Sequence, residues 1–573
     1  MQVLRRVRDA LSSARRGSLS SAAIDGAPAP KISDDLLHGI FLKTAARHPD
    51  LIAIRLIDPS PEAARKSELT YKELFERASH FAHYLVLNGV KRGDRVVICL
   101  PRGLDQYMAV LGTLLAGAAY VPADYSLPLE RLRHIIGDSA AAAVVTMQDR
   151  KCGLEDVGAA IVAIDGVLGE IAAPALALPV VASPVGDDLA YIIYTSGSTG
   201  VPKGAMICHR NIAFQVRAEG EVLKLTEEDV VYAGASLAFD VSVEEMWAAF
   251  LVGAVLLVGS EGLAKNLDEL PARLHANRAT VWCPVPSLLA AIDHPLPMIR
   301  LINAGGEAFP PELVRRWAVG SRRLINTYGP TETAVTVTFA ELSQGLPVTI
   351  GKPLRGVSIW IVDENLAPVK PGEEGELLIG GPTVGKGYLN DPALTGKKFV
   401  AITVPAGRKE RAYRTGDLVR EDANGDLIFC GRIDLQVKIR GYRVELGEIE
   451  NVIARDNAVA QVTVKFFDEP DQPQMLAAFV TPRQQSLIII DRLRGLAAQH
   501  LPDYMRPAAY VVASSLPVLI SGKIDRRALA RPHLPAMDEA PAAQAPETPF
   551  ETKLLEVWKT IFAPMPVSTI DNF

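Results

Sequence analysis

The chain has 573 residues, of which 49% are hydrophobic and 22% charged, so it can fill the cores of two or more globular units and is not disordered overall. Its 60 Lys and Arg residues against 66 Asp and Glu give a net charge of -6, which argues against a nucleic-acid-binding protein. Five cysteines without a C-x-x-C pair argue against a disulfide framework or a cysteine zinc site, and they favour a reducing, cytoplasmic compartment.

The first segment, residues 1–33, is basic and rich in Arg and Ser, and it lacks the continuous apolar core of a secretory signal. We interpret it as a basic N-terminal arm, while an organelle transit peptide and a membrane-surface helix stay open as alternatives. The longest apolar run, 246–259, has about 14 residues, and a membrane-spanning helix needs roughly 20. The sequence therefore predicts no membrane partner.

From about residue 34, strand-like apolar runs such as 95–100 and 142–147 alternate with amphipathic helical patterns such as 72–89. This alternation predicts an α/β fold with mainly parallel sheets. Residues 532–548 are rich in Pro, Ala and acidic residues and are predicted to be a linker. Residues 549–573 then begin with one amphipathic helix, which we interpret as the front edge of a further domain.

The sharpest local signal is YTSGSTGVPKG, residues 194–204, directly after the apolar run 189–193. Glycines and small hydroxyl residues let backbone amides approach an anion, and Lys203 adds a positive charge, which is how proteins hold phosphates. The spacing differs from that of the P-loop. Taken alone, the segment could also be an ordinary Ser/Gly loop that ends in a surface lysine.

Nine further motifs follow the order found in one enzyme family. Together they resemble the ANL adenylating enzymes, which comprise acyl-CoA synthetases, luciferases and the adenylation domains of nonribosomal peptide synthetases, and their form is similar to the peptide-synthetase branch. The motifs are LTYKEL (69–74), LLAGAAYVPAD (114–124), FDVS (239–242), NTYGPTE (326–332), GELLIGGPTVGKGYL (375–389), YRTGDL (413–418), GRIDLQVKIRGYRVELGEIE (431–450), LPDYMRP (501–507) and SGKIDR (521–526).

The resemblance implies a large multi-layer N-terminal lobe over 34–433 and a small α+β C-terminal lobe over 434–531. Asp434 matches the family's hinge between the two lobes. Residues 549–573 are similar to the first helix of a peptidyl carrier domain, whose phosphopantetheine-bearing serine is not in this chain. The implied partners are thus an amino-acid substrate and a carrier domain in cis.

The resemblance also implies an ATP site. Lys203 and the hydroxyls of 195–199 would hold the departing phosphates, Glu332 would bind Mg²⁺, Asp417 would accept the ribose hydroxyls, and Tyr328 would stack on adenine. The residues expected to contact ATP are Thr195, Ser196, Gly197, Ser198, Thr199, Gly200, Lys203, Gly305, Gly306, Glu307, Asn326, Tyr328, Gly329, Thr331, Asp417, Arg432 and Lys523.

Adenylation brings a carboxylate against the α-phosphate of ATP, two anions that repel each other. Catalysis therefore depends on cations and positioning rather than on a protein nucleophile. Lys523 is the expected catalytic cation, together with Lys203. Its motif departs from the family's usual Asn-Gly-Lys by having Ser521, which leaves the lysine intact.

Asp240 matches the aspartate that binds the substrate α-ammonium group in amino-acid-activating members. Glu244 lies four residues further on, so on a helix both carboxylates share one face, while Glu245 is turned about 100° away. Two buried carboxylates need cations, and a diamino acid supplies two. The expected substrate-contacting residues are Phe239, Asp240, Val241, Glu244, Cys283, Ile302, Ala304, Thr327, Val335, Thr336 and Lys523.

These observations predict ATP-dependent adenylation of an amino acid, then transfer to a phosphopantetheine thiol. L-Lysine is the first candidate, followed by ornithine and 2,4-diaminobutyrate, because one methylene discriminates by only about 1–3 kcal/mol. In the alternative, Glu244 points to solvent or pairs with a protein lysine. The rival functions are a CoA ligase or aryl-acid activator and an inactive ligand-binding relative. We expect an initiating module or a single-module enzyme of the poly-lysine synthetase type, while a small helper protein and the oligomeric state stay open.

Overall fold

The computed structural model describes residues 36–57, 67–171, 184–197, 201–260, 263, 266–403, 409–469, 472–483, 486–518, 524–533, 553 and 555. These residues form two compact units. The first holds the described residues up to Arg455 together with Asp491–Arg506, and the second holds Asp456–Ile490 and the described residues from Pro507 onward. The basic arm, nearly all of the linker and nearly all of the carrier-like segment lie outside the described residues, and the predicted lobe boundary at Asp434 stays a prediction.

A nine-stranded sheet in the described part of the first unit positions most of the predicted substrate residues. Its centre is parallel and its edges are antiparallel. In sheet order the strands are β15 (Lys352–Pro353), β14 (Thr338–Glu341), β13 (Arg323–Tyr328), β12 (Leu301–Gly305), β11 (Val281–Trp282), β9 (Val230–Ala233), β10 (Val255–Val258), β1 (Ile52–Leu56) and β2 (Glu68–Thr70).

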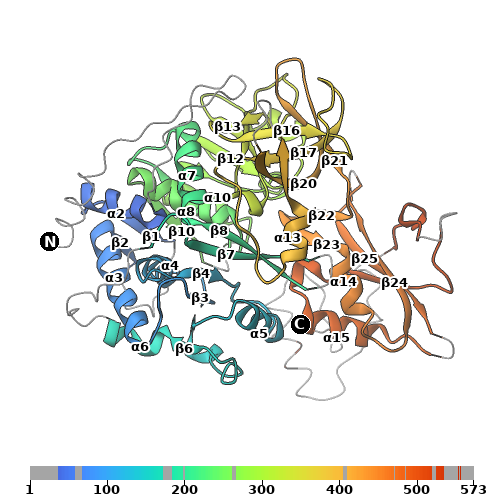
Figure 1. Cartoon of the computed structure of the whole chain (residues 1–573), viewed down its shortest axis with the longest axis horizontal. Helices are drawn as coiled ribbons and strands as arrows, with labels where there is room; N and C mark the ends of the chain where they lie inside the picture. The colour runs from blue at the N-terminus through green and yellow to red at the C-terminus, as the bar shows by residue number, and fades with distance from the viewer. Residues whose placement is uncertain are drawn as a thin grey trace. The chain divides into compact units, whose positions relative to one another are not determined.

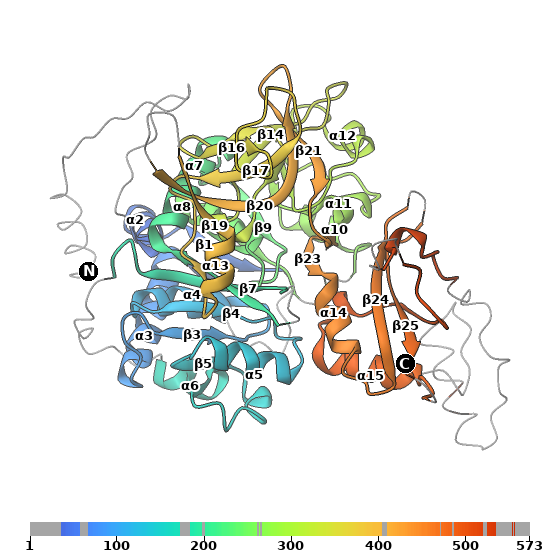
Figure 2. The same ribbon diagram turned by 45° about the vertical axis from the view of Figure 1, so that its right-hand side comes forward.

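A second sheet, seven-stranded in the described residues, carries the predicted phosphate loop. Strands β3, β4 and β7 run side by side (Figure 2) and are parallel. Strands β7 and β8 form an antiparallel pair. In sheet order the strands are β18 (Gly387–Tyr388), β8 (Lys203–Cys208), β7 (Leu189–Thr195), β4 (Ala119–Pro122), β3 (Arg95–Ile98), β5 (Ala143–Thr146) and β6 (Ala160–Ala163).

Helices cover these sheets and form the main core with them. Helix α3 begins with a capping box between Thr70 and Glu73, and α8 ends where Gly253 adopts a left-handed φ of 91°. Helices α7 and α8 lie beside each other (Figure 1). The described helices are α2 (Leu37–Arg47), α3 (Tyr71–Leu87), α4 (Leu104–Leu115), α5 (Leu129–Asp138), α6 (Ile164–Ile171), α7 (His209–Leu223), α8 (Val241–Val252), α10 (Leu270–Ala276), α11 (Pro286–Ala290), α12 (Pro311–Trp317), α13 (Pro392–Lys398), α14 (Leu446–Ile453) and α15 (Ile490–His500).

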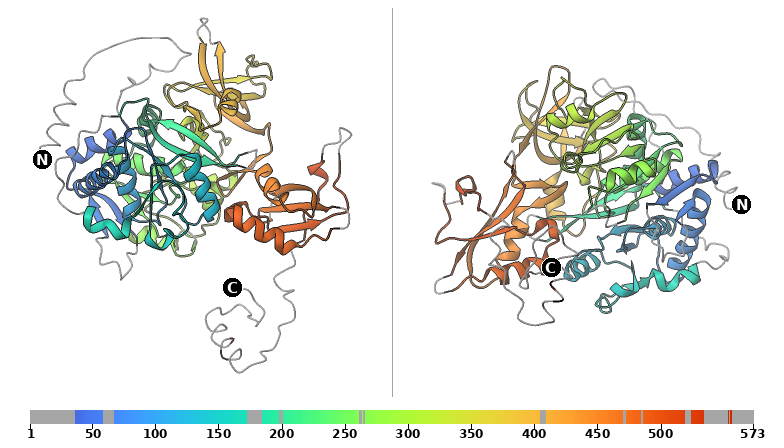
Figure 3. Two further views of the ribbon diagram at one scale, coloured as in Figure 1. Left: turned by 60° about the horizontal axis from the view of Figure 1, so that its bottom comes forward. Right: turned by 180° about the vertical axis from the view of Figure 1, so that it is seen from behind.

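The first unit also holds a third sheet and a hairpin, and the second unit holds a sheet of its own. The third sheet comprises β16 (Ser358–Val362), β17 (Gly375–Gly380), β20 (Lys409–Glu421), β19 (Phe399–Thr403) and β21 (Leu427–Arg432), and the hairpin comprises β22 (Gln436–Ile439) and β23 (Tyr442–Glu445). The sheet of the second unit, orange to red in Figure 3, is formed by β24 (Val459–Phe467), β25 (Met475–Pro482) and β26 (Ala509–Val512).

The predicted α/β class, with a large part of mainly parallel sheets and a smaller C-terminal part, is confirmed. Strands β5 and β9 are buried at every position. Both faces of such a strand are covered, which explains why its sequence is a continuous apolar run rather than an alternating one. Within the described residues, every helix is too short or too polar to span a bilayer.

Candidate functional site

The predicted phosphate loop joins β7 to β8, whose last and first residues, Thr195 and Lys203, are paired in register. The hydroxyl of Ser196 donates to the Arg443 carbonyl at 2.7 Å and accepts from the Glu445 N–H at 3.1 Å. The Gly197 N–H donates to the carboxylate of Glu448 at 3.1 Å. The start of the loop is therefore tied to the β23–α14 turn. Ser198, Thr199 and Gly200 lie outside the described residues.

Lys203 lies half-buried at the start of β8, with Nζ 3.8 Å from Glu445 and 5.1 Å from the centre of the Tyr388 ring. Burial, followed by the charge of Arg443, lowers the pKa of Lys203 to about 8, although Glu332 acts in the opposite direction. The Lys203 ammonium group therefore lies near the carboxylate of Glu445 but does not form a short ion pair with it.

Glu332 is completely enclosed. Arg443 Nη1 donates to its two oxygens at 2.9 and 2.8 Å, and the Tyr388 hydroxyl donates to Oε1 at 2.5 Å. Burial acts to raise the pKa of Glu332, but the charges of Arg443 and Lys203 outweigh it and lower the pKa to about 2. The carboxylate is therefore ionised at neutral pH.

Asp417 lies on β20 beside the end of β13. The Tyr328 hydroxyl donates to Asp417 Oδ2 at 2.5 Å, and Arg432 donates to Oδ1. Arg432 also contacts Asp434 with two nitrogens, at 2.7 and 2.8 Å. Gly416, with a φ of 76°, turns the chain beside these two side chains, and a Cβ there would lie 3.2 Å from both. The structure thus brings together four of the predicted residues, Tyr328, Asp417, Arg432 and Asp434.

The remaining predicted ATP residues have mixed surroundings. Glu307 accepts from the backbone of Ser287 at 2.9 Å and of Gly441 at 2.6 Å, and the amide of Asn326 donates to the Thr349 carbonyl. Gly329 cannot carry a side chain, since a Cβ would lie 1.9 Å from the Val335 carbonyl. Strand β12 ends at Gly305, and Gly306 follows it. The Thr195 hydroxyl is buried without a partner among the described residues.

Asp240 occupies the N-cap position of α8, and its side chain accepts a hydrogen bond from the Thr331 hydroxyl at 2.6 Å. Burial raises its pKa, against the hydrogen bond from Thr331 and the charge of Lys438. Phe239 meets the Tyr442 ring edge-on at 4.3 Å between centres. Asp240 therefore has a neutral donor but lacks a direct ion pair among the described residues, and Val241 is the first residue of the helix.

Glu244, one turn further along α8, is buried in a polar cluster. The Thr336 hydroxyl donates to Oε2 at 3.2 Å, and the Asn303 amide donates to Oε1. Burial raises the pKa of Glu244 well above its ordinary value, and the nearby carboxylate of Glu219 raises it further. Glu244 thus points into the protein, which removes the alternative of a solvent-facing side chain. Glu245 faces elsewhere and accepts from the backbone N–H groups of Gly234 and Ala235, each at 3.1 Å.

Two of the predicted pocket residues lie on the face of β12 that is turned away from Glu244. Ile302 and Ala304 belong to the hydrophobic cluster that contains Trp282, on the opposite face of β12 from Asn303. Because side chains alternate along a strand, Asn303 is the residue of this strand that faces Glu244. The substrate contacts predicted for Ile302 and Ala304 stay predictions. Thr327 lies on the neighbouring strand β13, where its register partner is Gly305. Gly305 is two residues after Asn303, so Thr327 lies on the same face of the sheet as Asn303.

Two other residues predicted to contact the substrate are Cys283 and Val335. Burial, then the charge of Glu244, raises the pKa of Cys283 well above its ordinary value, so this side chain is a neutral thiol near the glutamates. Val335 follows Ala334, and both have a left-handed φ, 73° and 57°. For a β-branched residue this conformation is strained, and it persists only where the surroundings enforce it.

Sequence reasoning missed three residues. Glu219 lies on α7 at a position that continues the buried series Ile212 and Val216, so a charge at an apolar-periodic position was the available signal. Asn303 was missed through the strand register, and nothing in the sequence marked Arg443 as the partner of Glu332. Lys523 lies outside the described residues.

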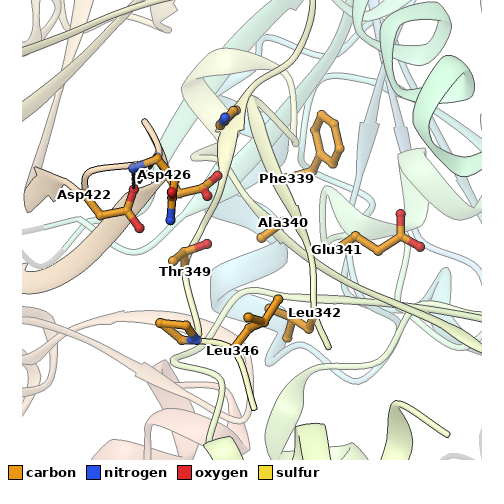
Figure 4. A pocket seen from close by; sticks show the side chains of 11 residues that line it. Phe339, Ala340, Glu341, Leu342, Leu346, Thr349, Asp422 and Asp426 are labelled. Atoms are coloured by element: carbon orange, nitrogen blue, oxygen red, sulfur yellow. Dashed lines mark hydrogen bonds between the residues drawn. The ribbon is translucent and has the colours of Figure 1, made fainter. Parts of the chain in front are cut away.

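A separate cavity lies between β14 and the turn after β20 (Figure 4). It is lined by Phe339, Glu341, Thr349, Asp422 and Asp426, among others. None of the predicted site residues lines this cavity, so we do not assign it to the reaction.

Comparisons with known proteins agree with this geometry. The family model described as AMP-binding enzyme matches residues 41–389, and the model of the AMP-binding enzyme C-terminal domain matches 448–523. The chain is 38% identical to a delta-poly-L-ornithine synthetase of Acinetobacter baumannii (strain AB307-0294) over 95% of this chain, and it spans 40% of that protein. It is 36% identical to novobiocin biosynthesis protein H of Streptomyces niveus over 91% of this chain and 87% of that protein.

A solved structure agrees as well. NpsA-ThdA, an artificially fused adenylation–PCP di-domain from Klebsiella oxytoca, is 26% identical, with a TM-score of 0.72 over 83% of this chain and 93% of that one. The chain spans less than half of the delta-poly-L-ornithine synthetase, so what the larger protein makes does not transfer directly to it.

Proposed function

The chain belongs to the AMP-binding enzyme family, and from that premise we propose that it adenylates an α-amino acid with a second amino group on its side chain. L-Lysine is our first candidate, with ornithine and 2,4-diaminobutyrate next. The observation that carries the proposal is the pair of inward-facing carboxylates, Asp240 and Glu244, one helical turn apart and without an ion-pair partner among the described residues.

The nucleotide side fits ATP by charge. Lys203, Arg432 and Arg443 gather where phosphates would lie, and the orphaned hydroxyl of Thr195 lacks a partner that a phosphate oxygen would supply. We propose that Lys523 supplies the further cation at the reacting carboxylate. These cations would stabilise the charge that develops between two anions.

Glu332 is the residue that we propose for Mg²⁺. It is ionised, and Mg²⁺ in phosphate-transferring sites is held by one or two carboxylates together with substrate phosphates. Both oxygens of Glu332 accept from Arg443 in this structure, so Arg443 has to release it for the ion to bind. Bound Mg²⁺ would neutralise charge on the phosphates.

The substrate side fits two ammonium groups. Asp240 would bind the α-ammonium group that all amino acids share, and Glu244 would bind the terminal one. The relative named delta-poly-L-ornithine synthetase supports this assignment, because ornithine carries an amino group at the end of its side chain. A carboxylate that faces a buried pocket without a cation is costly unless a ligand provides one.

We further propose that the product is transferred to the phosphopantetheine thiol of a carrier domain in cis. The adenylation–PCP arrangement named for the Klebsiella oxytoca structure supports this step. A CoA ligase remains the rival, and acceptance of free CoA as the thiol would favour it. The five cysteines form no disulfide and are all among the described residues, in keeping with the cytoplasmic location that we propose.

ATP–pyrophosphate exchange with a panel of amino acids tests the proposal. Lysine, ornithine and 2,4-diaminobutyrate should support exchange well above norleucine, which matches lysine in shape but lacks its terminal ammonium group. Glu244→Gln should lower kcat/KM for the preferred diamino acid by about 30-fold to several-thousand-fold, since about 2–5 kcal/mol is lost when one member of a buried charge pair is removed.

Asp240→Asn is the matched comparison, and it should weaken every amino acid. If no amino acid supports exchange, adenylation itself is wrong. If exchange occurs but norleucine equals lysine, only the diamino-acid assignment fails.

A further inference from the structure

A second glutamate lies beside Glu244 and belongs to no predicted motif. Glu219, on α7, is 2% exposed, and Gln215 from the preceding turn donates to its Oε2 at 2.7 Å. Its carboxylate is close enough to Glu244, Asn303 and Thr336 for each of them to shift its pKa, although burial, which raises it, is the main cause. Two buried carboxylates therefore face one another from neighbouring helices.

Acceptors exceed donors in this cluster. Oε1 of Glu219, Oε1 of Gln215 and Oδ1 of Asn303 are buried and have no hydrogen-bond partner among the described residues. Buried acceptors normally find a donor, so these three oxygens, one of them on Glu219 itself, point to an absent group that donates several hydrogen bonds. A primary ammonium group has three N–H donors and a positive charge.

Other buried carboxylates of the first unit show the contrast. Three of them each lie within 2.6 Å of an arginine nitrogen, in the pairs Glu448–Arg131, Asp229–Arg300 and Glu376–Arg414. Neither Glu219 nor Glu244 forms a salt bridge with any described lysine or arginine. These three carboxylates are thus neutralised by guanidinium groups, and Glu245 accepts from backbone N–H groups. The carboxylates of Glu219 and Glu244 have only neutral side-chain donors among the described residues.

We infer that Glu219 is a second specificity-determining carboxylate, and that Glu219 and Glu244 together bind the terminal ammonium group of the diamino acid. This inference rests on the proposed function, since it names how the same pocket reads its substrate. The ligand-free pair holds a proton. That proton leaves for solvent when the ammonium group arrives, so the buried site exchanges one positive charge for another.

Proton release gives the inference a signature. The other titratable groups that act on the pair are Cys283, after β11, and Glu245 on α8, whose carboxylate is turned towards the backbone of Gly234 and Ala235. The neutral groups that contact the pair are Gln215, Asn303 and Thr336. Because burial raises the pKa of both Glu219 and Glu244, lysine binding should strengthen with rising pH for as long as the ligand-free pair carries the proton, with a limit of about tenfold per pH unit. Norleucine binding should not strengthen.

The experiment uses the full chain and two readouts. Exchange assays compare lysine with norleucine for the wild type, Glu219→Gln, Glu244→Gln and the control Glu221→Gln, which changes a glutamate of the same helix that forms a long surface ion pair with Arg355. Calorimetry of lysine binding in two buffers of different ionisation enthalpy counts the protons released by the wild type.

Glu219→Gln should lower kcat/KM for lysine by about 10- to 100-fold, the usual cost of a hydrogen bond to a charged group, and leave norleucine unchanged or improved. Glu221→Gln should change neither, and the wild type should release about one proton on binding lysine.

Four results would overturn the inference or what it rests on. If Glu244→Gln abolishes the preference for lysine while Glu219→Gln leaves it intact, Glu219 is not part of the site, although the proposed function stands. If Glu219→Gln does not fold, release of no proton by the wild type still rejects the shared-proton pair. Preference of the wild type for arginine over lysine would replace the ammonium group by a guanidinium group. No preference for any cationic amino acid would reject the proposed function itself.

Discussion

Around the predicted nucleotide site, Glu332 and Asp417 each accept from an arginine. In the proposed substrate pocket, Glu219 and Glu244 instead lie together without a basic partner among the described residues. The two regions are built from the same kinds of side chain at similar burial. They differ in the sign of the unpaired charge. Basic side chains are in excess around the predicted nucleotide site, and carboxylates are in excess around Glu219 and Glu244.

This difference matches the charges of the two proposed ligands. ATP brings negative phosphates to the region with spare cations, and a diamino acid brings ammonium groups to the region with spare carboxylates. The comparison also predicts opposite costs in the ligand-free protein. Neutralising a carboxylate should destabilise the fold where an arginine depends on it and stabilise the fold where nothing does.

The largest effect should come from Arg443→Ala. It leaves Glu332 buried without its bidentate partner, and breaking a buried pair in this way costs about 3–5 kcal/mol. Denaturant unfolding should show this loss in the free energy of unfolding. Arg494→Ala, which removes an exposed ion pair with Asp491, is the control and should cost close to zero. Equal effects would mean that Glu332 is not compensated by Arg443.

Asp417→Asn should act on nucleotide binding. The amide cannot accept two hydroxyl donors as a carboxylate does, and a hydrogen bond to a charged group is worth about 1.5–3 kcal/mol, so the KM for ATP should rise about 10- to 100-fold. The KM for the amino acid should change much less. An unchanged ATP dependence would place Asp417 outside the ribose site.

Glu244→Gln should stabilise the ligand-free protein by about 1–2 kcal/mol. Because folding raises the pKa of Glu244, its favourable contribution is complete only below the unfolded value of about 4.3 and is lost as pH rises through the folded value. The gain in Tm should therefore grow with pH.

Glu332→Gln is the opposite control for this measurement. Folding lowers the pKa of Glu332 to about 2, so its contribution is present above about pH 4.3 and is lost as pH falls toward 2. It should lower Tm at neutral pH. If both substitutions shift Tm in the same direction, the contrast between the two regions is wrong.

The smallest effect should come from Lys203. With a pKa of about 8 before the nucleotide binds, it is mostly charged at pH 7 and mostly neutral at pH 8.5. ATP affinity measured without amino acid should fall about fourfold over that interval. Lys203→Arg stays charged and should flatten the profile. A wild-type profile as flat as that of the variant would remove Lys203 from the phosphate site.

Much of this arrangement could be predicted from the sequence. The predicted family and fold class are confirmed by the comparisons. They could be predicted because motifs such as YTSGSTGVPKG and YRTGDL specify a backbone geometry that few other proteins need. The spacing of Asp240 and Glu244 predicted that both lie on one face of a helix, and the structure has Asp240 at the N-cap of α8 with Glu244 in its first turn. The roles of the individual site residues, including Lys523, stay predictions.

What the sequence could not supply was the distant partner and the strand register. Arg443 meets Glu332 across 111 residues of chain, and no local pattern specifies such a contact. On β12, Ile302 and Asn303 differ by one position, and a buried strand with two covered faces gives no periodicity to choose between them. The burial of Glu219 was not predicted, because a single charged residue in an apolar helical pattern is usually interpreted as a side chain that faces solvent.

The short run from Thr331 to Thr336 has a consequence for evolution and engineering. Its first residue, Thr331, donates to Asp240, and its last, Thr336, donates to Glu244. Its second residue is Glu332, the predicted magnesium ligand, and two residues with a left-handed φ shape the turn before Thr336. A change of substrate preference made inside this run would disturb the nucleotide side as well. Retargeting this enzyme should therefore succeed more often when the six residues are exchanged as one cassette than when pocket positions are swapped singly.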